Sequence, residues 1–193
     1  MRRICVFCGS SLGARPVYAD VARALGALLA ARGIGLVYGG AKVGLMGAIA
    51  GAALSAGGEV IGVMPEPLVL KEVAHAGLTE LRVVKSMHER KAMMADLSDG
   101  FIALPGGFGT FEELCEVLTW AQLGLHRKPC GILNVDGYFD SLLQLFDHAV
   151  EEQFLRGAHR AMLITGGDAG SLIDRLLTYE HPRVDKWISP RAR

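Results

Sequence analysis

The chain has 193 residues, of which 51% are hydrophobic and 21% are charged, and its 20 basic residues balance 20 acidic ones. This length and composition are typical of one globular domain and exclude an intrinsically disordered chain. The zero net charge argues against broad attraction to nucleic acid or to an anionic membrane surface.

The sequence shows no signal for a membrane or for a metal. No apolar run approaches the roughly 20 residues of a membrane span, and the first residues lack the apolar core of a signal peptide, so we expect a cytoplasmic protein. Cys5 and Cys8 form a C-x-x-C pair, but a structural zinc site would need a second closely spaced Cys or His pair. We therefore expect neither a metal nor a cofactor. Both cysteines lie in a strand-like run, where positions three apart face opposite sides.

Short apolar runs alternate with amphipathic stretches from one end of the chain to the other. This alternation predicts an α/β fold in which helices cover both faces of a parallel sheet. We assign residues 1–180 to a single domain and residues 181–193 to an extended C-terminal tail anchored by Trp187. The predicted strands are 3–8, 34–38, 59–64, 81–85, 100–104, 130–134 and 161–165. The predicted helices are 16–32, 44–57, 86–97, 110–124, 139–152 and 169–179.

In such a sheet, ligands bind where the carboxyl ends of the strands lead through loops into helices. Glycine is concentrated in three of these loops, which read GSSLGARP, GGAKVG and PGGFGT and follow the first, second and fifth strands. In PGGFGT, Gly106, Gly107, Gly109 and Thr110 could hold an anion with backbone N–H groups and the positive end of a helix dipole. A tight turn from strand to helix explains the glycine spacing equally well.

Two common phosphate-binding motifs are absent. No lysine precedes Thr110 or another hydroxyl as a Walker A loop requires, and no G-x-G-x-x-G dinucleotide fingerprint occurs. Glu59 follows the second glycine cluster by about 20 residues, but it opens a predicted strand, whereas a ribose-binding acid ends one. The sequence therefore argues against NAD binding.

Two glutamates follow the PGGFGT loop directly. Thr110 and Glu113 fit a capping box, with threonine at the N-cap and glutamate three residues later. Consecutive helical residues point about 100° apart, so Glu112 and Glu113 cannot serve the same purpose. A ribose phosphate would explain carboxylates beside an anion site. Its hydroxyls donate hydrogen bonds to a carboxylate, and its ring becomes an oxocarbenium-like cation when the bond to the base breaks.

The helix that precedes this loop carries two basic residues on its apolar face. Ser86 and Glu89 form a capping box at its start. A guanidinium at Arg90 needs an anionic partner if it is buried, although long basic side chains also reach water along their apolar stems. We favour Arg90 in the cleft, with a phosphate, Glu113 or both in turn as its partner, because this helix and the PGGFGT loop begin at the same edge of the sheet.

Two stretches of the sequence resemble paired motifs of the Lonely Guy (LOG) family, the cytokinin riboside 5′-monophosphate phosphoribohydrolases that often carry the label lysine decarboxylase. SMHERK at 86–91 matches M-H-x-R-K, and PGGFGTFEE at 105–113 matches P-G-G-x-G-T-x-x-E. The similarity covers nearly everything from the first strand to about residue 155. It extends through FCGSS at 7–11, VYGGAKVGLMGAIA at 37–50, TWAQLGLHRKP at 119–129 and NVDGYFDSLL at 134–143.

The resemblance implies a Rossmann-like, doubly wound sheet and hydrolysis of the N-glycosidic bond of an adenine-type nucleoside 5′-monophosphate, either AMP or an N6-prenylated cytokinin ribotide. The products would be free base and ribose 5-phosphate. It also implies a homodimer with the site near the interface. Besides the second subunit, we expect a small-molecule nucleotide as the partner, and neither nucleic acid nor a membrane. Arg90 and Glu113 would be the catalytic pair. The implied substrate-binding residues are Glu72, Lys91, Gly106, Gly107, Phe108, Gly109, Thr110, Phe111, Glu112 and Thr119.

Two other functions are compatible with parts of the sequence. A nucleotide-binding module without catalysis would use the same loop, although the presence of both Arg90 and Glu113 favours an enzyme. A true lysine decarboxylase would need pyridoxal phosphate on a lysine, and no sequence context singles one out. The candidate lysines are Lys42, Lys71, Lys85 and Lys91.

Overall fold

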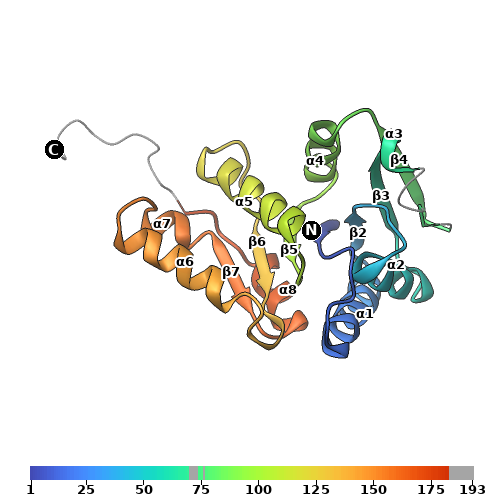
Figure 1. The fold of residues 1–193 in the computed structure, drawn as a ribbon, viewed down its shortest axis with the longest axis horizontal. Coiled ribbons are helices and arrows are strands. Elements are labelled where there is room, and N and C mark those ends of the chain that lie inside the picture. The colour runs from blue at the N-terminus through green and yellow to red at the C-terminus, as the bar shows by residue number, and fades with distance from the viewer. Residues whose placement is uncertain (70–73, 76, 183–193) are drawn as a thin grey trace.

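The computed structural model describes residues 1–69, 74–75 and 77–182. Within them, the strands form one parallel sheet of seven strands in the order β4-β3-β2-β1-β5-β6-β7 (Figure 1). All seven predicted strands are present within about two residues of their expected positions. The strands are β1 (Arg3–Phe7), β2 (Gly35–Tyr38), β3 (Val60–Pro65), β4 (Glu80–Val84), β5 (Gly100–Ala103), β6 (Cys130–Leu133) and β7 (Leu163–Gly166).

All six predicted helices form, and two short α-helices and one 3₁₀ turn were not predicted. The two helices have one turn each, α3 and α7, and the 3₁₀ turn is Val135–Gly137. None of the helices in the described residues is long and apolar enough to cross a membrane. The helices are α1 (Pro16–Ala31), α2 (Gly44–Ser55), α3 (Glu66–Val69), α4 (Met87–Asp96), α5 (Phe108–Gln122), α6 (Asp140–Glu151), α7 (Gly157–Arg160) and α8 (Ala169–Leu177).

Helices cover both faces of the sheet, which confirms the doubly wound fold. Alternate residues of β1 belong to different cores because strand side chains alternate between faces. Cys8 packs with α1, α2 and α8, whereas Cys5 packs with α4 and α5. Both thiols are free and buried, and they lie on opposite faces of the sheet, as the sequence predicted for positions three apart in a strand. Every residue of β1, β2, β3, β5 and β6 except Arg3 is buried, as expected for strands covered on both sides.

The strand order places a topological switch point between β1 and β5. From β1 the chain moves outward through β2 and β3 to β4, then returns to pair β5 with the other side of β1. In this pairing, Phe7 lies opposite Ala103, so the loops that follow β1 and β5 leave the sheet side by side. Such a point opens a crevice outside the carboxyl ends of the strands, where open α/β sheets bind ligands.

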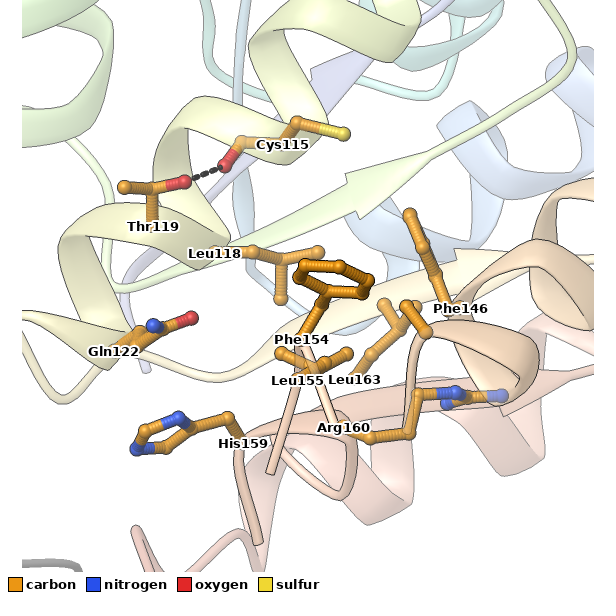
Figure 2. A pocket seen from close by; sticks show the side chains of 11 residues that line it. Cys115, Leu118, Thr119, Gln122, Phe146, Phe154, Leu155, His159, Arg160 and Leu163 are labelled. Carbon is orange, nitrogen blue, oxygen red and sulfur yellow. Dashed lines mark hydrogen bonds between the residues drawn. The ribbon is translucent and has the colours of Figure 1, made fainter. Parts of the chain in front are cut away.

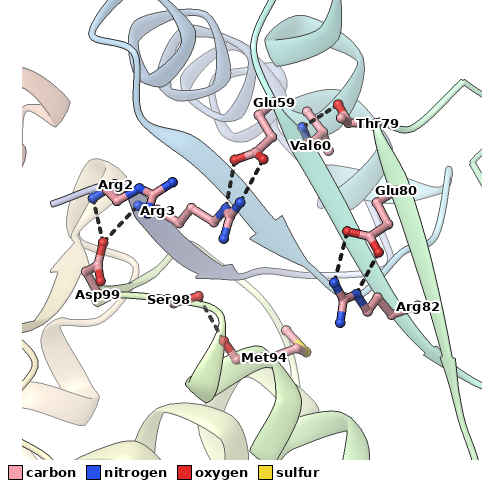
Figure 3. Close-up of polar contacts among 10 residues, drawn as sticks. All are labelled: Arg2, Arg3, Glu59, Val60, Thr79, Glu80, Arg82, Met94, Ser98 and Asp99. Carbon is pink, nitrogen blue, oxygen red and sulfur yellow. Dashed lines mark hydrogen bonds and ion pairs between the residues drawn. The ribbon is translucent and has the colours of Figure 1, made fainter.

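The opposite, amino edge of the sheet is held by ion pairs (Figure 3). The Arg3 guanidinium donates two hydrogen bonds to Glu59, at 2.7 and 2.8 Å. The backbone N–H groups of Arg2 and Arg3 both donate to the carboxylate of Asp99. Glu59 therefore joins β1 to β3 far from the crevice, in agreement with the prediction that it does not bind a ribose.

Candidate active site

The glycine loops after β1, β2 and β5 pack backbone against backbone. The N–H of Gly9 donates to the carbonyl of Pro105 at 3.0 Å. A Cβ at Gly106 would lie 2.9 Å from the nitrogen of Gly9, and one at Gly44, whose φ is +59°, would lie 2.2 Å from the carbonyl carbon of Ser10. Glycine is required at these positions because side chains would separate the loops. Part of the glycine pattern therefore serves loop packing.

Two glycines at the start of α5 have no such packing role. Gly107 is the N-cap of α5, and a Cβ at Gly107 or Gly109 would meet no atom of the described residues within 4 Å. The first N–H groups of a helix have no intrahelical partner, and they stand at the positive end of the helix dipole. The space beside both glycines is therefore open, and we expect the first N–H groups of α5 to be available to an anion.

The predicted capping box at Thr110 is wrong. Helix α5 begins at Phe108, two residues earlier than expected, and Thr110 is its third residue with only 3% of its surface exposed. Its hydroxyl oxygen would lie 2.1 Å from a Cβ at Gly106, so this side chain packs against the preceding loop. Glu113 consequently lies in the second turn of the helix and has no capping role.

Arg90 and Glu113 form a buried pair between α4 and α5. The capping box predicted at the start of α4 is present, with the hydroxyl of Ser86 accepting from the N–H of Glu89 at 3.1 Å. One turn later, Nη1 of Arg90 donates to Oε1 of Glu113 at 3.2 Å, and Nε donates to the carbonyl of Val63 at 3.0 Å. The two side chains are 11% and 12% exposed. The expected contact of Arg90 with Glu113 is therefore present.

The end of β2 makes room for this guanidinium. A Cβ at Gly39 would lie 2.2 Å from Nη2 of Arg90 and 3.0 Å from Sδ of Met46. Glycine at this position lets the guanidinium lie across the carboxyl end of β2. Arg90 is thus held by a backbone carbonyl of β3 and a carboxylate of α5, and it lies against the backbone at the end of β2.

Glu113 has an unusual pKa. Burial raises the pKa of Glu113 from 4.5 to about 7, because desolvation disfavours the charged form more than the Arg90 charge favours it. The neighbouring Glu112 raises it further. A carboxyl group with this pKa exists in both protonation states near neutral pH, as groups that take part in proton transfer or charge stabilisation often do.

Lys91 and Glu112 form a second link between the two helices. The Lys91 ammonium donates to Glu112 and, at 3.0 Å, to Glu116. Burial alone would lower the pKa of Lys91, but its hydrogen bonds to the two glutamates raise it above the ordinary value. The two adjacent glutamates thus have different partners, as the helical geometry predicted. Lys91 lies against α5 carboxylates, one residue away from the Arg90 pair.

The other predicted substrate-binding residues are more scattered. Phe108 is 92% exposed at the start of α5, and Phe111 packs edge-on against Phe139 with ring centroids 6.3 Å apart. The hydroxyl of Thr119 donates to the carbonyl of Cys115 at 2.7 Å, nearly two helical turns beyond Glu113. The structure therefore does not bring Thr119 to the buried pair. Glu72 lies outside the described residues.

A cavity lies beside the glycine loop, between two of the loops in which the sequence predicted a ligand site. It has a volume of about 320 Å³ and is lined by Ser10, Ser11, Tyr18, Tyr138 and the backbone of 105–107, among others. The tyrosines come from α1 and from the connection before α6, more than a hundred residues apart. The predicted site residues Gly106 and Gly107 line this cavity, but Tyr18 and Tyr138 were not among the predicted site residues.

A second cavity lies between α5, α6, α7 and β7 (Figure 2). Its volume is about 240 Å³, and apolar side chains such as Leu118, Phe146 and Phe154 form much of its wall. Cys115 and Thr119 of α5 line it, with Thr119 bonded to the backbone of Cys115. Burial raises the pKa of the Cys115 thiol, so this side chain is a poor nucleophile.

Comparison with known proteins agrees with the motifs. A family model described as "Possible lysine decarboxylase" matches residues 46–176. A probable cytokinin riboside 5′-monophosphate phosphoribohydrolase of Oryza sativa subsp. japonica is 54% identical over 178 residues, 92% of this chain and 78% of the relative. A cytokinin riboside 5′-monophosphate phosphoribohydrolase of Arabidopsis thaliana is 50% identical over 191 residues, 99% of this chain and 89% of the relative.

Solved structures of lower identity share the fold. The molybdenum cofactor carrier protein of Chlamydomonas reinhardtii superposes with a TM-score of 0.71 at 22% identity, over 92% of this chain and 99% of that one. At this identity the likeness shows the fold alone. The sequence relatives are far closer, and they match nearly the whole chain. The chain therefore belongs to the Lonely Guy family, the family of the cytokinin riboside 5′-monophosphate phosphoribohydrolases.

Proposed function

We propose that this protein hydrolyses the N-glycosidic bond of an adenine-type nucleoside 5′-monophosphate and releases the free base and ribose 5-phosphate. The substrate is a cytokinin riboside 5′-monophosphate, which the names of the relatives specify, or AMP. One observation carries the proposal. A buried arginine and a buried glutamate, Arg90 and Glu113, are 3.2 Å apart beside a glycine loop at the carboxyl edge of the sheet.

The proposed mechanism divides the substrate between the loop and the pair. The N–H groups at the start of α5 and the Arg90 guanidinium bind the 5′-phosphate, so that binding energy remote from the reacting bond positions the sugar. As the bond from C1′ to the base breaks, positive charge develops on the ring, and the Glu113 carboxylate stabilises it. The base leaves with the electron pair of the broken bond and gains a proton, while water adds to C1′ and loses one, so the proton on the base comes in net from that water. Glu113 accepts or orients the proton of that water.

Incubation with a panel of substrates tests this proposal. Nucleoside mono-, di- and triphosphates and free nucleosides would each be incubated with the protein, and released base would be separated by chromatography. We expect base release from monophosphates alone, because the loop and Arg90 enclose a single phosphate. Tight binding of AMP without release of adenine would instead identify a nucleotide-binding module. Release of base from free nucleosides at the same rate would contradict a role for the phosphate.

The contacts of the lysines argue against lysine decarboxylation. A Schiff-base lysine must be deprotonated to attack an aldehyde, and desolvation usually lowers its pKa. Lys91 is the candidate next to the Arg90–Glu113 pair, yet Glu112 and Glu116 raise its pKa. Lys71 lies outside the described residues. We expect purified protein to be colourless and to release no carbon dioxide from lysine when pyridoxal phosphate is added.

We also propose that the protein is a homodimer that uses the α5–α6–α7 face. A two-fold interface brings the same patch of both subunits together, so the patch needs both protrusions and a hollow. This face has the apolar cavity and, at its rim, Phe154 with 89% of its surface exposed. Light scattering should give the mass of a dimer, and Phe154→Asp should give a monomer. Leu177→Asp, an exposed leucine of α8, is the control. A monomeric wild type at micromolar concentration would contradict the proposal.

A cytoplasmic location is the last part of the proposal. All four thiols are free, and the buried ones at Cys5, Cys8 and Cys130 pack in the cores of the sheet. Free thiols are typical of proteins kept in a reducing compartment. Fractionation of the source cells should recover the protein with the cytosolic enzymes, and recovery from an oxidising compartment would contradict this.

A further inference from the structure

The connection between β6 and α6 is a closely held segment beside the glycine loop. Asp136 has a φ of +51°, which is uncommon for a residue other than glycine, and the next residue, Gly137, has a φ of +73°. The amide of Asn134 closes the segment, because its oxygen accepts from the N–H of Phe139 at 2.8 Å and its nitrogen donates to Asp140 at 2.6 Å. The segment is therefore held by its own hydrogen bonds and, from α1, by the ion pair of Arg15 with Asp136.

Two aromatic residues at the end of this segment contact α5 and the loop that precedes it. Phe139 is buried and packs edge-on against Phe111, in the first turns of α5. Tyr138 packs edge-on against Tyr18, with ring centroids 5.8 Å apart. Its hydroxyl donates a hydrogen bond to the carbonyl oxygen of Gly106 at 2.5 Å. The tyrosine thus reaches from one connection into the loop that follows β5.

The acceptor of this hydrogen bond belongs to the peptide between Gly106 and Gly107. In a trans peptide the C=O and the N–H point in opposite directions. When the Gly106 carbonyl points to Tyr138, the N–H of Gly107 must point away from it. A peptide between two glycines can rotate easily because neither residue has a Cβ. A hydrogen bond to its carbonyl therefore selects the direction of its N–H.

We propose that Tyr138 is a positioning residue, which fixes the Gly106–Gly107 peptide so that the Gly107 N–H is available to the substrate phosphate. This inference rests on the proposed function, because it assigns the phosphate to the loop. The tyrosine does not touch the reacting bond. Loss of its hydroxyl should weaken binding of the phosphate equally in the ground state and in the transition state, and this raises KM and leaves kcat unchanged.

Tyr138→Phe isolates the hydroxyl because the ring and its packing on Tyr18 remain. Losing one hydrogen bond between neutral groups should raise KM for the monophosphate about 3- to 10-fold. The inhibition constant of the product, ribose 5-phosphate, should rise by the same factor, and kcat should stay within about twofold. A purely structural role would lower the active fraction, hence kcat, and would leave KM and the inhibition constant unchanged. Tyr179→Phe is the control, because its hydroxyl lies near His181 instead of the loop.

Failure of this inference and failure of the proposed function have different signatures. If the wild type releases base and Tyr138→Phe shows wild-type KM and inhibition by ribose 5-phosphate, the positioning role is wrong. If the wild type releases no base from any nucleotide, the proposed function is wrong. Calorimetric titration of ribose 5-phosphate into both proteins then decides the role of Tyr138. Equal affinities would overturn it, and a 3- to 10-fold loss in the variant would support it.

Discussion

Replacing Glu113 by glutamine should inactivate the enzyme and stabilise its fold. Glutamine has the shape of the protonated glutamate, but it cannot ionise. The variant therefore lacks the carboxylate that stabilises charge at C1′, and we expect base release to fall by about 100- to 1000-fold. The same change removes a charge that the folded protein holds in a desolvated position, where only 12% of the side chain is exposed.

The size of the stabilisation follows from the pKa of Glu113. Its value of about 7 in the folded protein lies above the ordinary 4.5, so the folded state binds the proton more tightly than the unfolded chain does. The favourable contribution is complete below pH 4.5 and is lost as the pH rises through 7. At about 1.4 kcal/mol for each pH unit between the two values, the full loss is about 3 to 4 kcal/mol. Because glutamine cannot ionise, the variant does not lose this contribution to its stability as the pH rises.

Urea unfolding at two pH values measures this effect. Fluorescence of Trp120, which packs against the core beneath α5, would report the transition. The stability advantage of Glu113→Gln over the wild type should be about 2 to 3 kcal/mol larger at pH 8 than at pH 5. Glu152→Gln replaces an exposed glutamate and should show no such difference. An advantage that is equal at both pH values would refute the raised pKa, and activity within tenfold of the wild type would refute the catalytic role.

The remaining predictions concern the surroundings of this carboxylate. The ionised form of Glu113 is the active one, so kcat/KM should rise with pH through about 7. Glu112→Gln removes a charge that raises the pKa of Glu113, so this variant should shift the rise to lower pH. Arg90→Ala should lower base release by at least about 100-fold and shift the rise to higher pH, because Arg90 lowers the same pKa. Both shifts are read from pH–rate profiles, and an unchanged profile would contradict them. Gly39→Ala should lower activity at least about tenfold by displacing the guanidinium, since its Cβ would lie 2.2 Å from Nη2. Gly51→Ala, whose Cβ meets no described atom within 4 Å, should keep wild-type rates in the same assay.

The alternation of apolar runs was sufficient to predict the strands and long helices. A fully buried parallel strand consists of a short apolar run, and a covering helix has one apolar face, so both patterns are visible in the sequence. Chain order also predicted that the site lies after the strand ends. Arg90 and Glu113 were identified from paired motifs, and the structure places them 3.2 Å apart. Their assignment as the catalytic pair remains a proposal.

The sequence failed where a local pattern had two explanations. Thr110 and Glu113 have the spacing of a capping box, but α5 begins at Phe108 because Gly107 already provides the extended residue that precedes a helix. Thr110 is instead buried against Gly106. Local spacing cannot distinguish the two arrangements, because what decides between them is the packing of Thr110 against the loop between β5 and α5.

By itself, the sequence determined the elements, the fold class and the family, because each depends on patterns within short stretches of chain. Only the tertiary structure decided which loops meet. Strand order places β1 beside β5, although about a hundred residues separate them. This neighbourhood brings Gly9 against Gly106 and brings Tyr18 and Tyr138 to one cavity. It also buries Glu113 beside Arg90, and a pKa depends on desolvation and on the distance to neighbouring charges, which are properties of the folded chain.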